Sequence, residues 1–169
     1  MLLETMEDLL VDQLRDLYSI ETQVEVALPI MVEQASCATL REALTAHFEE
    51  TEEQIVRLQE VFGTLGVSAR GPRCLGIAGL LQEGEDTMRR SVRGGLLDAV
   101  LIACLRRVEH YELAAYSSAI AYARQLGQSR VVELLERSLA SEAKADANLC
   151  RIAETEVLEQ GVQAGVLTQ

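Results

Sequence analysis

Apolar residues recur at helical spacing through most of this chain and divide it into four long segments and one short one. In the first segment, leucine and valine return every three or four positions between Leu10 and Met31, which predicts one buried face of a helix. A shorter amphipathic pattern occupies residues 74–88. The same periodicity predicts long helices over residues 5–35, 40–62, 96–126 and 130–157.

Local signals mark several helix ends. Serine or threonine followed three residues later by an acid is typical of a helix start, and glycine is typical of a helix stop. The predicted signals are capping boxes at Thr5 with Asp8 and at Thr39 with Glu42, stops at Gly63 and Gly127, and a cap at Ser129. The last residues have two glycines and no firm pattern. We therefore expect one helical domain over residues 1–158 and a C-terminal tail over residues 159–169.

The lengths of the links predict the topology. Short links join the first long helix to the second and the third to the fourth, so each pair should form an antiparallel hairpin. The link over residues 63–95 is long enough to cross the whole bundle and carries the short helix. Two hairpins joined by one long crossover predict an all-α, ferritin-like four-helix bundle with a short fifth helix in the crossover.

Polar residues interrupt the apolar face of every long helix near its middle. A buried carboxylate without a partner is costly, so these interruptions need an explanation. The separation of the acids within the first hairpin nearly equals that within the second, which would bring them to one level of the bundle. The residues concerned are Glu21 in the first helix, His47 and Glu50 in the second, Glu109 and Glu112 in the third, and Glu142 and Asp146 in the fourth.

Each position also has a simpler interpretation. A single glutamate on an apolar face is often an edge residue that reaches water, and His47 alone would most simply be a hydrogen-bonded core histidine. Asp146 could pair with Lys144 or Arg151 at the surface, and Arg106 or Arg107 could pair with Glu109. Independent edge residues, however, have no reason to align in all four helices. The alignment favours a buried carboxylate cluster.

Charge indicates what such a cluster would hold. Protonating most of these acids would require extreme pKa shifts, whereas two divalent or trivalent cations would neutralise them. Oxygen-rich ligation with little nitrogen and no thiolate favours iron first and manganese second over structural zinc. The formal net charge of −12 argues against nucleic acid and anionic membrane as partners. Four scattered cysteines without a C-x-x-C pair, and the absence of a signal peptide pattern, predict a cytoplasmic protein with reduced thiols.

At these residues the chain resembles the YciE/YciF-type ferritin-like family. The matching segments, in order, are DLYSIETQ, AHFEETEEQIVRLQEVF, VEHYELAAY and LASEAKAD. The resemblance implies a ferritin-like bundle, a link to bacterial stress responses and a di-metal site similar to that of rubrerythrins. On that pattern the ligands come from Glu21 and Glu50 in the first hairpin, and from Glu109, Glu112 and Glu142 in the second.

The chain departs from the ferritin-like pattern in one respect. Di-iron oxidases of this class commonly carry Glu-x-x-His in the second and fourth helices, but Glu53 and Ala145 occupy the histidine positions here. His47 and Asp146 are the candidates to replace those ligands or to support them from behind. His110 is rotated by roughly 100° from its neighbour Glu109 on the helix, so it is the poorer candidate.

Two functional hypotheses follow. The first is a cytoplasmic protein, expected to be a homodimer, that binds two iron or manganese ions and carries out oxygen- or peroxide-linked redox chemistry under stress. The second is a non-catalytic, oligomeric stress or interaction protein, in which the carboxylates form a polar core layer that specifies helix pairing. The metal content of the protein distinguishes the two.

Overall fold

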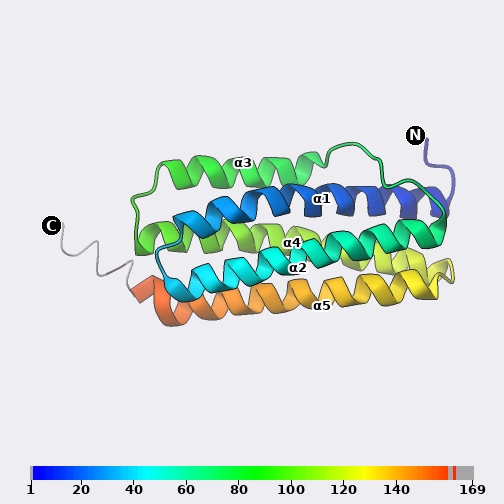
Figure 1. Cartoon of the computed structure of the whole chain (residues 1–169). Coiled ribbons are helices and arrows are strands. Elements are labelled where there is room, and N and C mark those ends of the chain that lie inside the picture. The colour runs from blue at the N-terminus through cyan, green and yellow to red at the C-terminus, as the bar shows by residue number, and fades with distance from the viewer. Residues whose placement is uncertain (1, 160–161, 163–169) are drawn as a thin grey trace.

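The fold is known from a computed structural model that describes residues 2–159 and residue 162. The described part is helical, as the hydrophobic pattern predicts (Figure 1). The helices are α1 (Met6–Gln34), α2 (Ala38–Leu65), α3 (Leu75–Arg89), α4 (Gly95–Gln125) and α5 (Ser129–Ile152), followed by a π-helical turn, η1 (Ala153–Val157).

The four long helices form a bundle of two antiparallel hairpins. α1 packs against α2 and α4, and α5 packs against the same two helices, so α1 and α5 lie on one diagonal and α2 and α4 on the other. The chain returns along the length of the bundle between α2 and α4, and α3 lies on the outside of α1 and α4 in this crossover (Figure 1). The predicted ferritin-like arrangement with a short helix in the crossover is confirmed.

Two of the predicted helix ends are confirmed. Thr5 and Asp8 form a complete capping box, in which the Asp8 N–H donates to Thr5 Oγ1 at 3.0 Å and the Thr5 N–H donates to Asp8 Oδ2 at 3.0 Å. Gly127 follows α4 with a φ of 69°, a left-handed conformation that glycine adopts without strain. Both signals depend only on neighbouring residues.

Three predicted helix ends are wrong. α2 begins before Thr39, with Cys37 at the cap position, because Asp98 of α4 accepts the backbone N–H groups of Ser36 and Cys37 at 2.7 and 2.9 Å. α2 also continues through Gly63 and stops at Gly66, where φ is 67°. Ser129 is the first helical residue of α5 rather than its cap. A cap supplied by a distant helix has no local sequence signal.

The chain remains helical through Glu159, and α5 gives way to π-helix over Ala153–Val157. Val157 is buried against the bundle, which fixes this last turn. The predicted tail falls mainly on residues 160–161 and 163–169, which lie outside the described residues. The boundary between domain and tail therefore stays a prediction.

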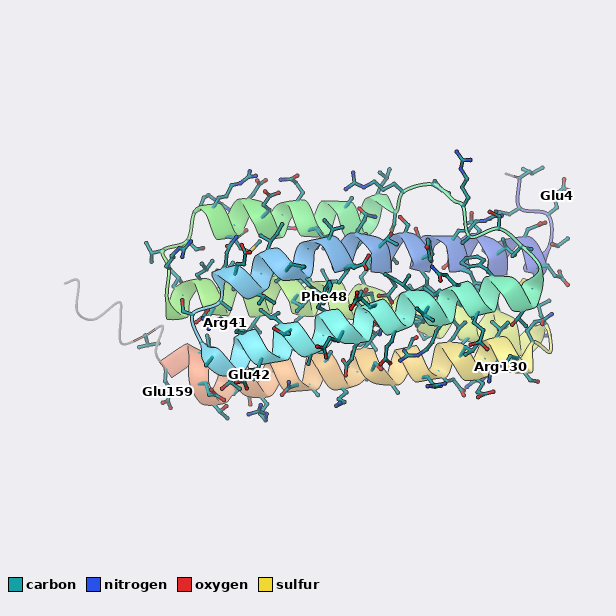
Figure 2. All side chains as sticks on the ribbon, in the orientation of Figure 1. Glu4, Arg41, Glu42, Phe48, Arg130 and Glu159 are labelled. Atoms are coloured by element: carbon teal, nitrogen blue, oxygen red, sulfur yellow. The ribbon has the colours of Figure 1, made fainter. Side chains whose placement is uncertain are left out.

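Apolar side chains fill the centre of the bundle, and charged ones cover it. Glu42 and Arg130 project outward from α2 and α5 (Figure 2). None of the described helices is long and apolar enough to cross a membrane. The exceptions to the apolar interior are few, and most of them gather at one level.

Candidate metal centre

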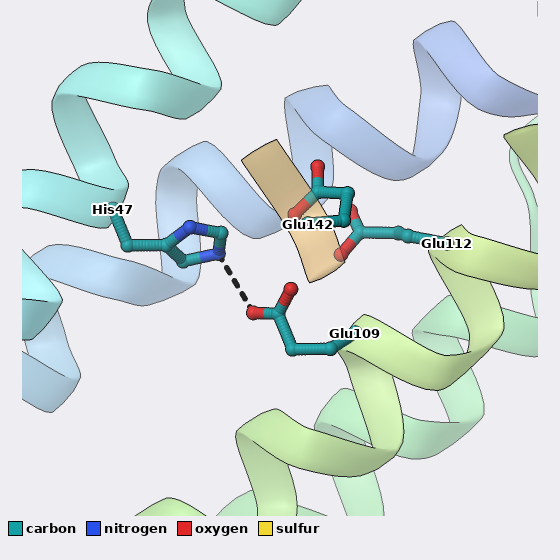
Figure 3. A group of neighbouring side chains, drawn as sticks. All are labelled: His47, Glu109, Glu112 and Glu142. Carbon is teal, nitrogen blue, oxygen red and sulfur yellow. Dashed lines mark ion pairs between the residues drawn. The ribbon is translucent and has the colours of Figure 1, made fainter. Parts of the chain in front are cut away.

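Four ionisable side chains from three helices meet inside the bundle (Figure 3). His47 comes from α2, Glu109 and Glu112 from α4, and Glu142 from α5. One nitrogen or carboxylate oxygen from each lies within 4.8 Å of those from the other three. A group of this size and composition can hold a metal ion.

Helical spacing explains why these side chains point inward. On α4, buried Leu105 is followed by Glu109 and Glu112, at steps of four and three residues that stay on one face. His47 continues the buried face of α2 three residues after Leu44, and Glu142 continues that of α5. The helix faces that bury leucines along the rest of the bundle therefore bury acids and a histidine at this level.

The cluster is buried, and most of its polar atoms lack hydrogen-bond partners among the described residues. Glu109, Glu112 and Glu142 are each no more than 1% exposed, and His47 is 5% exposed. Within the described part of the chain, both carboxylate oxygens of Glu109 and of Glu112, and Oε2 of Glu142, accept no hydrogen bond. His47 Nε2 lies 2.9 Å from Glu109 Oε1, but the angles do not make a hydrogen bond with any described group. Buried polar atoms normally have hydrogen-bond partners. This many buried oxygens and nitrogens without one indicate a missing partner.

Burial and mutual repulsion raise the carboxyl pKa values. Removal from water is the largest cause for all three acids, and it raises the pKa of Glu109 to about 8. The pKa values of Glu112 and Glu142 also rise well above the usual range, with the neighbouring carboxylates adding to the effect of burial. Without a cation the cluster is therefore partly protonated near neutral pH.

Glu21 lies beside this group rather than within it. Its carboxylate is 1% exposed and accepts a short hydrogen bond at Oε1 from the hydroxyl of Tyr116. Burial raises the pKa of Glu21 well above its usual range, and the charge of Glu142 raises it further. Glu21 is thus close enough to interact electrostatically with the cluster, and Tyr116 holds it in place.

Gln54 is a member of the site that the sequence prediction did not include. It lies on the buried face of α2 and is 0% exposed. Its Nε2 donates to Oε1 of Glu142, while its own Oε1 has no hydrogen-bond partner among the described residues. Its position between buried Thr51 and Leu58 is the signal that could have identified it.

Two of the predicted ligands are engaged elsewhere. Glu50 is half-buried, and its Oε1 lies 3.6 Å from Nζ of the exposed Lys144. Asp146 accepts a hydrogen bond of 2.7 Å from Nε of Arg106, and its other oxygen lies 3.5 Å from His110 Nε2. Both flank the cluster, since their charges contribute to the raised pKa of Glu109. Ligation by either would require it to leave its present partner.

The sequence matches a family profile described as a domain of unknown function, DUF892, over residues 5–161. The chain belongs to this family. It is 33% identical over 152 residues to protein YciF of Escherichia coli strain K12, and the match covers 89% of this chain and 92% of YciF. The resemblance to YciF-type proteins noted from the sequence is confirmed.

Solved structures support the same relationship to YciF-type proteins. The structure of YciF, described as a stress protein of E. coli, superposes with a TM-score of 0.88 at 32% identity and covers 94% of this chain and 100% of YciF. YcfI of Rhodopseudomonas palustris, for which a structural role has been suggested, gives 0.84 at 43% identity over 86% of this chain and 93% of YcfI. A Xanthomonas campestris protein at 21% identity gives 0.73 and shows the fold alone.

Proposed function

We propose that this protein is a cytoplasmic, homodimeric metal-binding protein of the bacterial stress response that holds two divalent ions, iron first and manganese second. The observation that carries the proposal is a set of buried ligand atoms from His47, Glu109, Glu112 and Glu142 that lie within 4.8 Å of one another, most of them without a hydrogen-bond partner among the described residues. Carboxylate oxygens with one imidazole suit iron or manganese. The donors therefore fit such ions.

Charge supports two ions rather than one. The buried glutamates Glu21, Glu109, Glu112 and Glu142 carry four negative charges when ionised, and two divalent ions balance them. His47 and the glutamates of α4 and α5 would hold the first ion, and Glu21 and Glu50 are the residues left to complete the second. Asp146 as a ligand stays a prediction, because Arg106 now occupies it.

The stress role rests on the relatives and on the chemistry of the ions. YciF is described as a stress protein, and bound iron or manganese would supply one-electron redox chemistry toward oxygen or peroxide. The chain itself supplies a buried site, an imidazole and carboxylates held by Tyr116 and Gln54. A non-catalytic structural role is the second candidate, favoured by the description of YcfI.

Elemental analysis of protein purified without added metal tests the proposal. We expect about two first-row ions per chain, as in related bundle sites, or uptake of that number from added Fe(II) or Mn(II). Glu112→Gln should lower occupancy strongly, because Glu112 has both oxygens open toward the cluster. Glu83→Gln is the control, since Glu83 is exposed on α3. If the protein neither contains nor takes up metal, the metal-binding proposal is wrong and the non-catalytic structural role remains.

A further inference from the structure

A cavity of about 420 Å³ lies between α1, α3 and the first half of α4. It exists because α3 packs mainly on α4 and touches α1 only lightly. Small residues line it on both sides, Ala27 on α1 and Ala78 on α3. Gly84 lets α3 approach α4, since a Cβ there would lie 3.2 Å from Cys104 Cβ. The result is a slot roofed by α3, of the size that small-molecule sites have.

The floor of the slot is apolar. Met31 from α1 and Leu97, Leu105 and Val108 from α4 line it, and each is at most 4% exposed. The α4 residues follow one another on a single face of that helix. An apolar chain placed along this face would replace water with hydrocarbon contacts, which is favourable.

The rim of the slot is basic although the chain is acidic. Arg73, Arg89 and Arg93 line it with one acid, Glu85, in a chain of net charge −12. Arg89 is paired with Glu85, and Arg73 donates from Nε to the Gln23 side chain at 2.7 Å. Arg93 is exposed and forms no ion pair with any acid in residues 2–159. Arg93 is therefore the cation available to a ligand.

The location of Arg93 identifies the polar end of the slot. Arg93 and Ser91 both line the slot and immediately precede α4. α4 begins after Gly94, and no described side chain caps its first turn. A helix start of this kind favours negative charge. The arginine and the uncapped helix start thus meet at one end of an apolar slot, while the Ser91 hydroxyl donates to the Thr87 carbonyl at 2.8 Å.

We propose that this slot binds an elongated amphipathic carboxylate, of the class of a medium-chain fatty acid. The carboxylate lies against Arg93 and the start of α4, and the hydrocarbon chain lies under α3 on Leu97 and Leu105. This site is separate from the metal cluster, whose ligands face the interior of the bundle. Its occupation does not depend on the proposed metal function.

Calorimetric titration of the full-length protein with decanoate tests the proposal, with decanol as the uncharged probe. We expect saturable binding of one decanoate per chain, and about tenfold weaker binding of decanol, because a charge-assisted contact to arginine is lost. Arg93→Glu should weaken decanoate binding by at least as much and leave decanol unchanged. Arg137→Glu, an exposed arginine on α5, is the matched control.

A second variant tests the slot itself. Ala27→Phe fills the cavity and should abolish binding of both probes, whereas Ala114→Phe, exposed on α4, should not; melting curves show whether each variant folds. Glu112→Gln should bind decanoate like the unmodified chain, which separates this site from the metal site. Equal affinity for decanol and decanoate, or no binding of either, would overturn the proposal.

Discussion

Nε2 of His47 on α2 lies 2.9 Å from Oε1 of Glu109 on α4, across the diagonal of the bundle. Both side chains are buried, and the contact lacks hydrogen-bond geometry within the described structure. A buried imidazole and a buried carboxylate placed this close, with their remaining ligand atoms open, can share a cation. Replacing each of the two histidines of the chain should therefore affect metal binding differently.

His47→Leu should weaken binding of Co(II), used as a spectroscopic substitute for Fe(II), by more than about tenfold, the least that loss of a supporting contact usually costs. His110→Leu should leave the affinity nearly unchanged, because His110 is 62% exposed and faces Asp146. Absorption titrations of the two variants measure both affinities. Equal effects would place the metal near Asp146 rather than in the buried cluster.

Gln54→Leu tests whether the amide holds Glu142 in place. Loss of the hydrogen bond to Oε1 of Glu142 frees that carboxylate to rotate, and we expect metal affinity to fall by about 10- to 100-fold, as for other residues that orient ligands. Gln59→Leu is the control, since Gln59 is exposed and its side chain makes only one hydrogen bond in the described part of the chain, to the Tyr18 hydroxyl at 3.3 Å. Unchanged affinity in Gln54→Leu would assign the amide a packing role alone.

Asp98→Ala should destabilise the fold without affecting the metal cluster. Asp98 is 1% exposed and accepts the Ser36 and Cys37 N–H groups between α1 and α2. Loss of two charge-assisted bonds costs roughly 2–4 kcal/mol of unfolding free energy. Denaturant unfolding of this variant, with the exposed Asp86→Ala as control, measures the loss. A change below about 0.5 kcal/mol, as at ordinary surface sites, would contradict the assignment.

The metal-free protein should lose stability as pH rises from about 4.5 to about 8. The folded-state pKa of Glu109 is raised to about 8, from 4.5. Between these values the folded state binds more protons than the unfolded state, so the free energy of unfolding falls with rising pH. Glu112 and Glu142 act in the same direction. Melting temperatures of chelated protein across this range measure the trend, and a rise with pH would contradict it.

Metal binding should oppose the loss of stability at higher pH. Protons and metal ions compete for the same carboxylates, so metal affinity rises with pH and binding releases protons. Binding to the folded state alone adds roughly 3–4 kcal/mol at 100 to 1,000 times the dissociation constant. Metal-loaded protein should therefore melt higher than chelated protein, with a difference that widens as pH increases. A chelator without effect at pH 8 would place no metal in the cluster.

The fold could be predicted because it depends on features that the sequence shows directly. Periodicity near 3.6 residues defines the long helices, and the lengths of the links decide which helices form hairpins. The acids of α4 were identified because Glu109 and Glu112 interrupt a leucine seam, and both are buried. Features that depend on a distant helix were missed, as Asp98 at the start of α2 shows.

Within the site, small rotations about the helix axis decide which of the predicted residues turn inward. His47 and Glu50 are one turn apart, yet His47 is 5% exposed and Glu50 is half-buried beside Lys144. Gln54 lies one further turn along and is fully buried. A neutral amide does not stand out in a search for charges, and periodicity does not resolve which of several polar residues on one edge turns inward. Packing against α5 decides that.

Replacement of buried acids by leucine gives the sharpest stability test. Glu112 has no hydrogen-bond partner in the described structure, so Glu112→Leu removes a buried, repelled carboxylate and continues a leucine seam. We expect it to abolish much of the metal binding and to stabilise the metal-free protein by about 1–4 kcal/mol. Glu21→Leu should stabilise it less, because the buried Tyr116 hydroxyl would lose its acceptor, at a cost of about 1–3 kcal/mol.

Melting curves of both variants, with and without chelator, separate these contributions. Chelated Glu112→Leu should melt above the chelated parent by at least about 2 °C, since 1 kcal/mol corresponds to 2–4 °C at this chain length. The double variant Glu21→Leu with Tyr116→Phe should recover the stability that Glu21→Leu alone lacks, because the stranded hydroxyl is gone. If Glu112→Leu melted below the parent without metal, the carboxylate would have a stabilising partner, and the cluster would not be a site held open for cations.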